Sequence, residues 1–201
     1  MLNIPGDVRW TQKGITVVGG HRYGSLHFQL YYPLGLCVDD DQTVALVDQL
    51  HHRIVQWKKG DNYGHVIAGG KGSGNELNQL KYPTDILSDQ ETDRLIVCDR
   101  GNRRILQWSL RRGTEQGELL IDNIAYYELV MNNQRYRYVS DIEKHAVRRY
   151  QLGTHNGTVV AGGNGEGVYL NQLNIPELSF CRSTTECLCI RQLQSSCNAV
   201  E

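Results

Sequence analysis

The sequence predicts an all-β protein made of repeated four-stranded antiparallel units, and three recurring motifs lead to this prediction. The first is a short apolar segment between glycines, at residues 14–20, 64–70 and 157–163. The second is Gln-Leu-x-x-Pro, at residues 29–33, 79–83 and 172–176. The third runs from an aspartate to an aromatic residue, and its members are Asp48, Arg53 and Trp57, then Asp99, Arg104 and Trp108, then Asp141 and Tyr150.

The motifs keep one register along the chain. Successive aspartates lie 51 and 42 residues apart, so the third unit is a repeat that lacks an insertion around residues 123–127. Glycines and other turn residues separate the apolar strands, and no unit contains a stretch of helical periodicity. Four short strands at a period of about 40–50 residues are the signature of a β-propeller.

We therefore expect an incomplete β-propeller of about three to four blades, open rather than closed. Residues 1–13 are a lead-in, and the blades occupy residues 14–176, divided into units 14–63, 64–116, 117–156 and the start of a fourth, 157–176. In the first unit we expect strands at residues 36–38, 43–47, 53–57 and 65–68. In the third unit we expect the second strand at 135–138, with one face buried. Unpaired edges at the ends of such an arc favour self-association.

The units resemble the NHL repeat, whose pattern is Pro-x-Gly-[apolar]-x-[apolar]-Asp, a strand ending in Asp, Asn/His-x-Arg-[Ile/Val] and an aromatic residue. Residues 33–39 (Pro-Leu-Gly-Leu-Cys-Val-Asp) begin the pattern, and Asp48, residues 52–54 (His-Arg-Ile) and Trp57 complete it. The second unit has Asp85 where the pattern has Gly. The third unit lacks the Pro-x-Gly entry and has Ala146 in place of the Arg.

The resemblance implies a scaffold that binds a protein or another macromolecule, as NHL propellers do, some of them binding RNA through basic faces. The alternative is a propeller enzyme similar to the peptidyl-hydroxyglycine amidating lyases, which hold zinc through histidines in the channel. That site would need single, convergent histidines, whereas His51, His52 and His145 occupy repeat positions. We therefore expect no catalytic residue, metal or cofactor.

Propellers bind ligands at the face formed by the loops that join strands two to three and strands four to one. Rigid scaffolds commonly carry function on such loops. The candidate binding residues in these loops are Tyr32, His51, Tyr82, Arg100, Asn102, Glu143 and Lys144. The Asp–Arg pairs recur in the first two blades, so we assign them to blade building, as turn caps and cross-strand pairs.

Composition sets limits on partners and compartment. The 21 basic and 22 acidic residues nearly cancel, so net charge does not imply nucleic acid. No apolar run reaches the roughly 20 residues that span a bilayer. The first residues lack a signal-peptide pattern, which indicates the cytoplasm. Asn156 begins an Asn-Gly-Thr glycosylation sequon that would matter in a secreted chain whose N-terminus lies upstream, so both compartments stay open.

After Pro176 the repeat pattern stops, and residues 177–201 form a divergent tail with four cysteines. A disordered tail and a zinc site are two readings, but Cys-x-Cys spacing without a nearby histidine does not fit a usual zinc knuckle. A third reading follows from the codons. Translated one nucleotide out of frame, permissible codons for residues 180–201 spell V-D-R-Q-Q-S-V-Y-V-S-D-N-S-N-H-R-V-M-Q-W-K, which is another blade in register.

We therefore predict that the tail is an out-of-frame remnant of the fourth blade. In the genomic DNA and the transcript, inserting or deleting one or two bases near the codons for residues 176–180 should restore this blade and continue into further ones. Sequencing both sides of the reading frame is the measurement. A stop codon before the recovered tryptophan codon would refute the frame shift and leave the cysteines to be explained.

Overall fold

A computed structural model describes residues 13–20, 24, 29–111, 113–151, 153–167, 169, 171–182, 186–192 and 195–200. Apart from two 3₁₀ turns of three residues each, the described chain contains strands, turns and loops. No helix in this part of the chain is long and apolar enough to cross a membrane.

Three sheets have four antiparallel strands each, ordered as they occur along the chain. The first contains β1 (Pro33–Val38), β2 (Val44–Asp48), β3 (Arg53–Trp57) and β4 (His65–Gly69). The second contains β5 (Ile86–Asp89), β6 (Arg94–Asp99), β7 (Arg104–Ser109) and β8 (Glu118–Ile121). The third contains β9 (Tyr126–Met131), β10 (Arg137–Asp141), β11 (Ala146–Tyr150) and β12 (Thr158–Gly162). These sheets confirm the predicted four-stranded antiparallel architecture, whereas the unit bounds 14–63, 64–116 and 117–156 stay a prediction.

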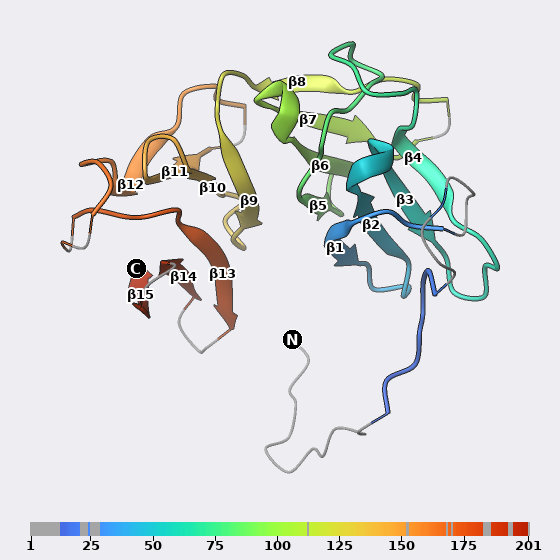
Figure 1. Ribbon diagram of the computed structural model, residues 1–201, viewed down its shortest axis with the longest axis horizontal. Helices are drawn as coiled ribbons and strands as arrows, with labels where there is room; N and C mark the ends of the chain where they lie inside the picture. The colour runs from blue at the N-terminus through green and yellow to red at the C-terminus, as the bar shows by residue number, and fades with distance from the viewer. Residues whose placement is uncertain are drawn as a thin grey trace.

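A fourth sheet has three strands, β13 (Glu177–Arg182), β14 (Glu186–Gln192) and β15 (Ser195–Val200). The first strands of successive sheets, β1, β5, β9 and β13, lie next to one another around a common centre. Figure 1 shows the four sheets as an arc that is open between the first and the last. The expected incomplete, open β-propeller is therefore confirmed.

Each pair of neighbouring sheets encloses its own apolar core. Alternate residues of β6 face opposite ways: Leu95 and Val97 pack against the first sheet, and Ile96 and Cys98 pack against the third. Strands buried on both faces read as continuous apolar runs. Leu36 and Val38 of β1 are exposed rather than buried, because no described sheet covers that side of β1.

The aromatic residue of the third motif packs on a glycine in every blade. Trp57, Trp108 and Tyr150 are buried, and a Cβ atom added at Gly64, Gly117 or Gly157 would lie less than 3 Å from the corresponding ring. Each of these glycines therefore leaves room for its aromatic neighbour.

The prediction for the second strand of the third unit is wrong in position and in burial. Arg135 has a φ of 66°, and its N–H donates to the carbonyl of Asn132 in a turn, so β10 begins two residues later than expected, at Arg137. Both faces of β10 are then largely buried, because β10 lies inside a blade between two neighbours.

In the tail, residues 187–190 lie within β14. Position 191, where the shifted reading places an aspartate, lies near the end of β14, as Asp48, Asp99 and Asp141 end their strands. Position 200, where it places a tryptophan, ends β15 as Trp57 ends β3. The backbone is thus compatible with a blade at these positions, and the frame shift stays a prediction.

A buried ion pair joins the second and third strands of the first two blades. Asp48 lies opposite Arg53 and Asp99 opposite Arg104, each pair 2.8 Å apart between arginine Nε and carboxylate Oδ2. The other carboxylate oxygen accepts the backbone N–H of Tyr31 or of Lys81. Each pair therefore also anchors the chain that enters its blade.

We predict that Asp99→Ala destabilises the protein by about 3–5 kcal/mol, because it leaves the Arg104 guanidinium buried without its counter-charge. The matched control is Glu118→Gln, which breaks the exposed Arg94–Glu118 pair and should change stability by about 0–1 kcal/mol. Urea unfolding of the three proteins measures both values. Equal effects of the two substitutions would contradict the role of the buried pair.

Candidate functional site

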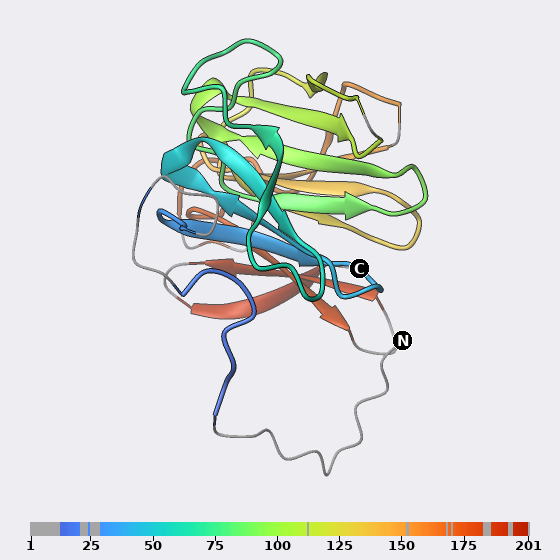
Figure 2. The same cartoon turned by 90° about the vertical axis from the view of Figure 1, so that its right-hand side faces the viewer.

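The predicted binding residues lie in the β2–β3, β6–β7 and β10–β11 turns and where the chain enters β1 and β5. Seen from the side, the strands of successive sheets run along a similar direction, so their turns collect at two opposite ends (Figure 2). We call the end that carries the predicted residues the loop face, and its members are Tyr32, His51, Tyr82, Arg100, Asn102, Glu143 and Lys144.

Two of these residues are aromatic and stand in the left-handed region just before a proline. Tyr32 and Tyr82 have φ values of 60° and 46°, and Ile175 repeats the geometry at 46°. Non-glycine residues seldom adopt this conformation. Their side chains are 61%, 44% and 41% exposed. The entries to the first, second and fourth sheets thus each present a large side chain at the loop face.

In the first two blades, the residue after the turn between the second and third strands contacts the next blade. In the first blade, His52 Nδ1 accepts a hydrogen bond from the backbone N–H of Tyr82, 3.1 Å away, and its ring meets the Tyr82 ring edge-on at 4.8 Å. Burial lowers the pKa of His52, which favours the neutral imidazole that this acceptor role requires. The Tyr82 ring is therefore held in place from the first blade.

In the second blade the equivalent residue, Arg103, forms a two-pronged ion pair with Glu143 of the third. The hydrogen bonds from Arg103 lower the pKa of Glu143. Both side chains are about half exposed, so the pair orients Glu143 without contributing much to stability. Lys144 is exposed, and its backbone N–H donates to the Asp141 carboxylate.

Two other predicted residues are tied to the buried ion pairs. His51 Nδ1 lies 2.8 Å from Asp48 Oδ2, and the Asn102 amide donates to Asp99 and to the carbonyl of Gly74. Their side chains are partly buried, whereas Arg100 is exposed. The structure thus brings Tyr32, Tyr82, Arg100, Glu143 and Lys144 to the surface of the loop face.

Two carboxylates near the centre of the arc had no functional assignment from the sequence. Asp85 Oδ2 accepts the backbone N–H of Leu129 in the third blade at 2.8 Å, and Glu128 accepts that of Leu178 in the fourth sheet. At the first junction, Gly35 donates its N–H to the carbonyl of Thr84. Gly35, Asp85 and Glu128 occupy equivalent positions, four residues before Asp39, Asp89 and Asn132. Their hydrogen bonds connect each blade to the next.

Asp85 lies against Gly35, where an added Cβ would come within 2.2 Å of Asp85 Oδ1. Burial, with a further contribution from Glu128, raises the pKa of Asp85 to about 7. No group of three or more His, Cys, Asp or Glu side chains in the described part of the chain is arranged to hold a metal ion.

No family model and no curated protein matches the chain. Solved structures that resemble it include one from a nidogen/laminin complex, with a TM-score of 0.63, 19% identity and coverage of 83% of this chain and 59% of that one. A gluconolactonase from Xanthomonas campestris has a TM-score of 0.62 and 16% identity, and the match covers 85% of this chain and 58% of that one. A streptogramin B lyase has a TM-score of 0.54 and 11% identity, and the match covers 81% of this chain and 48% of that one.

The chain spans less than two thirds of each of these solved chains. At such low identity the similarity establishes the fold alone. The protein is a β-propeller chain, and its described residues form an open part of the ring.

We predict that stability falls between about pH 4 and pH 7 because of Asp85. Its pKa is higher in the folded protein than the ordinary 3.8, so the folded state binds the proton more tightly and is stabilised by protonation. As pH rises through this window the stabilisation is lost, by at most about 4 kcal/mol at 1.4 kcal/mol per pKa unit.

Asp85→Asn should remove much of this pH dependence, because an amide does not ionise and its oxygen can still accept from Leu129. Asp40→Asn, at an exposed carboxylate, is the control. Denaturant unfolding of the three proteins at pH 5 and pH 8 measures the effect. The assignment fails if Asp85→Asn keeps the wild-type slope with pH.

Proposed function

We propose that this chain is a non-catalytic binding scaffold of the NHL type, which holds a protein or another macromolecular partner on the loop face. Several observations support the proposal. The motif residues 33–39 and 48–57 follow the NHL pattern. In addition, the loop face presents residues whose conformation and exposure suit binding better than folding.

The observation that carries the proposal is the pair of exposed tyrosines in left-handed backbone conformations. Tyrosine is enriched among residues that dominate binding energies, because it offers a large contact area with little conformational freedom to lose. A residue in a sparsely populated backbone region points to function when the surroundings impose it. Here Pro33 and Pro83 follow directly, and the buried ion pairs fix the preceding residues, Tyr31 and Lys81.

Charged groups flank the tyrosines. Arg100 and Lys144 are exposed, and Glu143 is oriented by Arg103. Charged groups on the same face as aromatic anchors suit a protein surface with mixed charges, because polar groups give specificity while the anchors supply affinity.

We predict that Tyr82→Ala weakens partner binding at least tenfold, which corresponds to about 1.4 kcal/mol, while folding stays intact because the side chain is a loop residue. The control is Tyr63→Ala, which removes an exposed tyrosine from the β3–β4 connection at the other end of the strands. Partners captured from an extract of the source cells by the wild-type chain are identified, purified and titrated against all three proteins.

Two outcomes count against the proposal, and one selects the kind of partner. Equal binding by wild type and Tyr82→Ala removes the loop face from the interface. Ribonuclease-sensitive capture identifies RNA as the partner. Stoichiometric zinc in the purified protein, together with turnover of a hydroxyglycine-extended peptide, favours the lyase-like alternative. A partner lost on Tyr82→Ala and retained on Tyr63→Ala supports the scaffold.

A further inference from the structure

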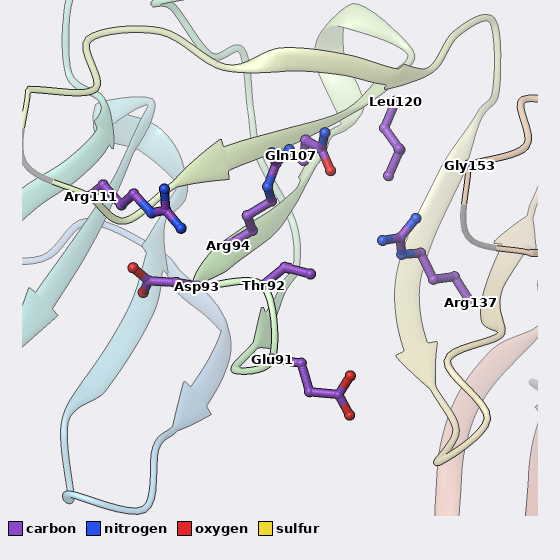
Figure 3. A pocket seen from close by; sticks show the side chains of 9 residues that line it. All are labelled: Glu91, Thr92, Asp93, Arg94, Gln107, Arg111, Leu120, Arg137 and Gly153. Atoms are coloured by element: carbon purple, nitrogen blue, oxygen red, sulfur yellow. The ribbon is translucent and has the colours of Figure 1, made fainter.

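A pocket of about 490 Å³ opens between the second and third blades, at the strand ends opposite the loop face. Its walls come from the β5–β6 turn, β7, the β7–β8 connection, β8, the start of β10 and the β11–β12 connection. Its volume falls within the range of about 300–1,000 Å³ that is usual for small-molecule sites. Figure 3 shows the lining side chains, which are Glu91, Thr92, Asp93, Arg94, Gln107, Arg111, Leu120, Arg137 and Gly153.

Arg137 occupies a position that is apolar in the other blades. It lies opposite Tyr150, as Val44 lies opposite Trp57 and Leu95 opposite Trp108. The arginine is only 2% exposed, and its guanidinium points into the pocket (Figure 3). An arginine at a core position of the repeat has no role in building a blade.

Arg137 forms no ion pair within the described chain, and its buried Nε has no hydrogen-bond partner there. The Nε atoms of Arg135 and Arg148 also lack partners, but these two arginines are engaged by carboxylates, and Arg137 is not. Asp89, whose charge acts on Arg137, forms its ion pair with Arg135 instead. Burial lowers the pKa of Arg137. A buried charged donor without a partner is costly, so such groups call for an explanation.

Thr92 supplies a second unsatisfied donor in the same pocket, because its buried Oγ1 has no partner either. Two other lining charges are paired, Arg94 with Glu118 and Glu91 with Arg135. Asp93 also lines the pocket, as a carboxylate without an ion pair among the described residues. Arg111 is exposed at the edge of the pocket, and no ion pair engages it among the described residues. Two guanidinium groups and a hydroxyl are thus available to a ligand.

We propose that this pocket binds the oxyanion group, phosphate or carboxylate, of a small organic molecule through Arg137 and Thr92. Arg111 lies on the opposite side of the pocket (Figure 3), where it can contact another part of the same molecule. Guanidinium groups bind such oxygens with two parallel charge-assisted hydrogen bonds, and a threonine hydroxyl adds a third donor. The pocket is larger than a single oxyanion, so the rest of the molecule has room beside Leu120. The site is independent of the partner proposed for the loop face, since the two lie at opposite ends of the strands.

The test is a titration of the full chain with inorganic phosphate and, separately, with acetate, at constant ionic strength, followed by calorimetry and by the melting temperature. We expect saturable binding of at least one anion and a rise in melting temperature with its concentration, because ligands that bind only the folded state stabilise it. Arg137→Gln and Thr92→Val should each weaken binding, the first at least tenfold. Arg137→Lys should restore only part of the affinity.

Arg149→Gln is the matched control, because Arg149 is an exposed arginine that stacks on Tyr136 and lines no part of the pocket. It should bind the anion as the wild type does. Should Arg137→Gln fail to fold, Thr92→Val provides the same measurement at the other donor of the site. The proposal is overturned if neither anion binds saturably, or if Arg149→Gln weakens binding as much as the pocket variants do.

Discussion

The buried aspartate–arginine pair is the interaction on which the first two blades depend. Asp48 and Asp99 are fully buried, and each receives hydrogen bonds from the arginine opposite and from the chain entering the blade. The arginines in turn donate to entry carbonyls, of Gln29 and of Gln79. In each of these blades, one ion pair thus fixes both the hairpin of the second and third strands and the connection that enters the blade. The tyrosine after the anchored residue, Tyr32 or Tyr82, is exposed at the loop face.

The third blade shows how the same requirement is met without the arginine. Ala146 stands opposite Asp141, and Arg148 approaches Asp141 from two residues further along β11, 3.9 Å away. The shorter entry to this blade lacks the Gln-Leu-x-x-Pro segment, so there is no long connection for an arginine to anchor. Glu128 and Asp85 instead join neighbouring blades through backbone N–H groups of the inner strands. In the third blade, the hydrogen bonds that hold the chain between blades therefore lie at the centre of the arc rather than at the turn between the second and third strands.

Repetition made the fold predictable, because a motif that recurs in register marks the contacts every blade must make. The strands of the first unit were located to within a residue or two, except that β1 begins three residues earlier, at Pro33. The second strand of the third unit was misplaced, because the Arg-Tyr alternation of residues 135–138 suggested one buried face, whereas the left-handed Arg135 starts a later strand. The contacts of His52 with Tyr82 and of Arg103 with Glu143 join different blades, and no spacing in the sequence encodes them.

Departures from the repeat carry different information from the repeat itself. A blade-building residue is needed in every blade, so the positions where a single unit breaks the pattern are free to serve another purpose. Asp85, which replaces the glycine of the pattern, has a structural role, and so has Glu128 at the equivalent position. Each accepts a hydrogen bond from the next blade. Arg137 has no such role: it replaces a core residue, is buried, and leaves its Nε without a partner. A buried guanidinium without an ion pair in a core position costs stability, and the anionic ligand that we propose would supply the counter-charge.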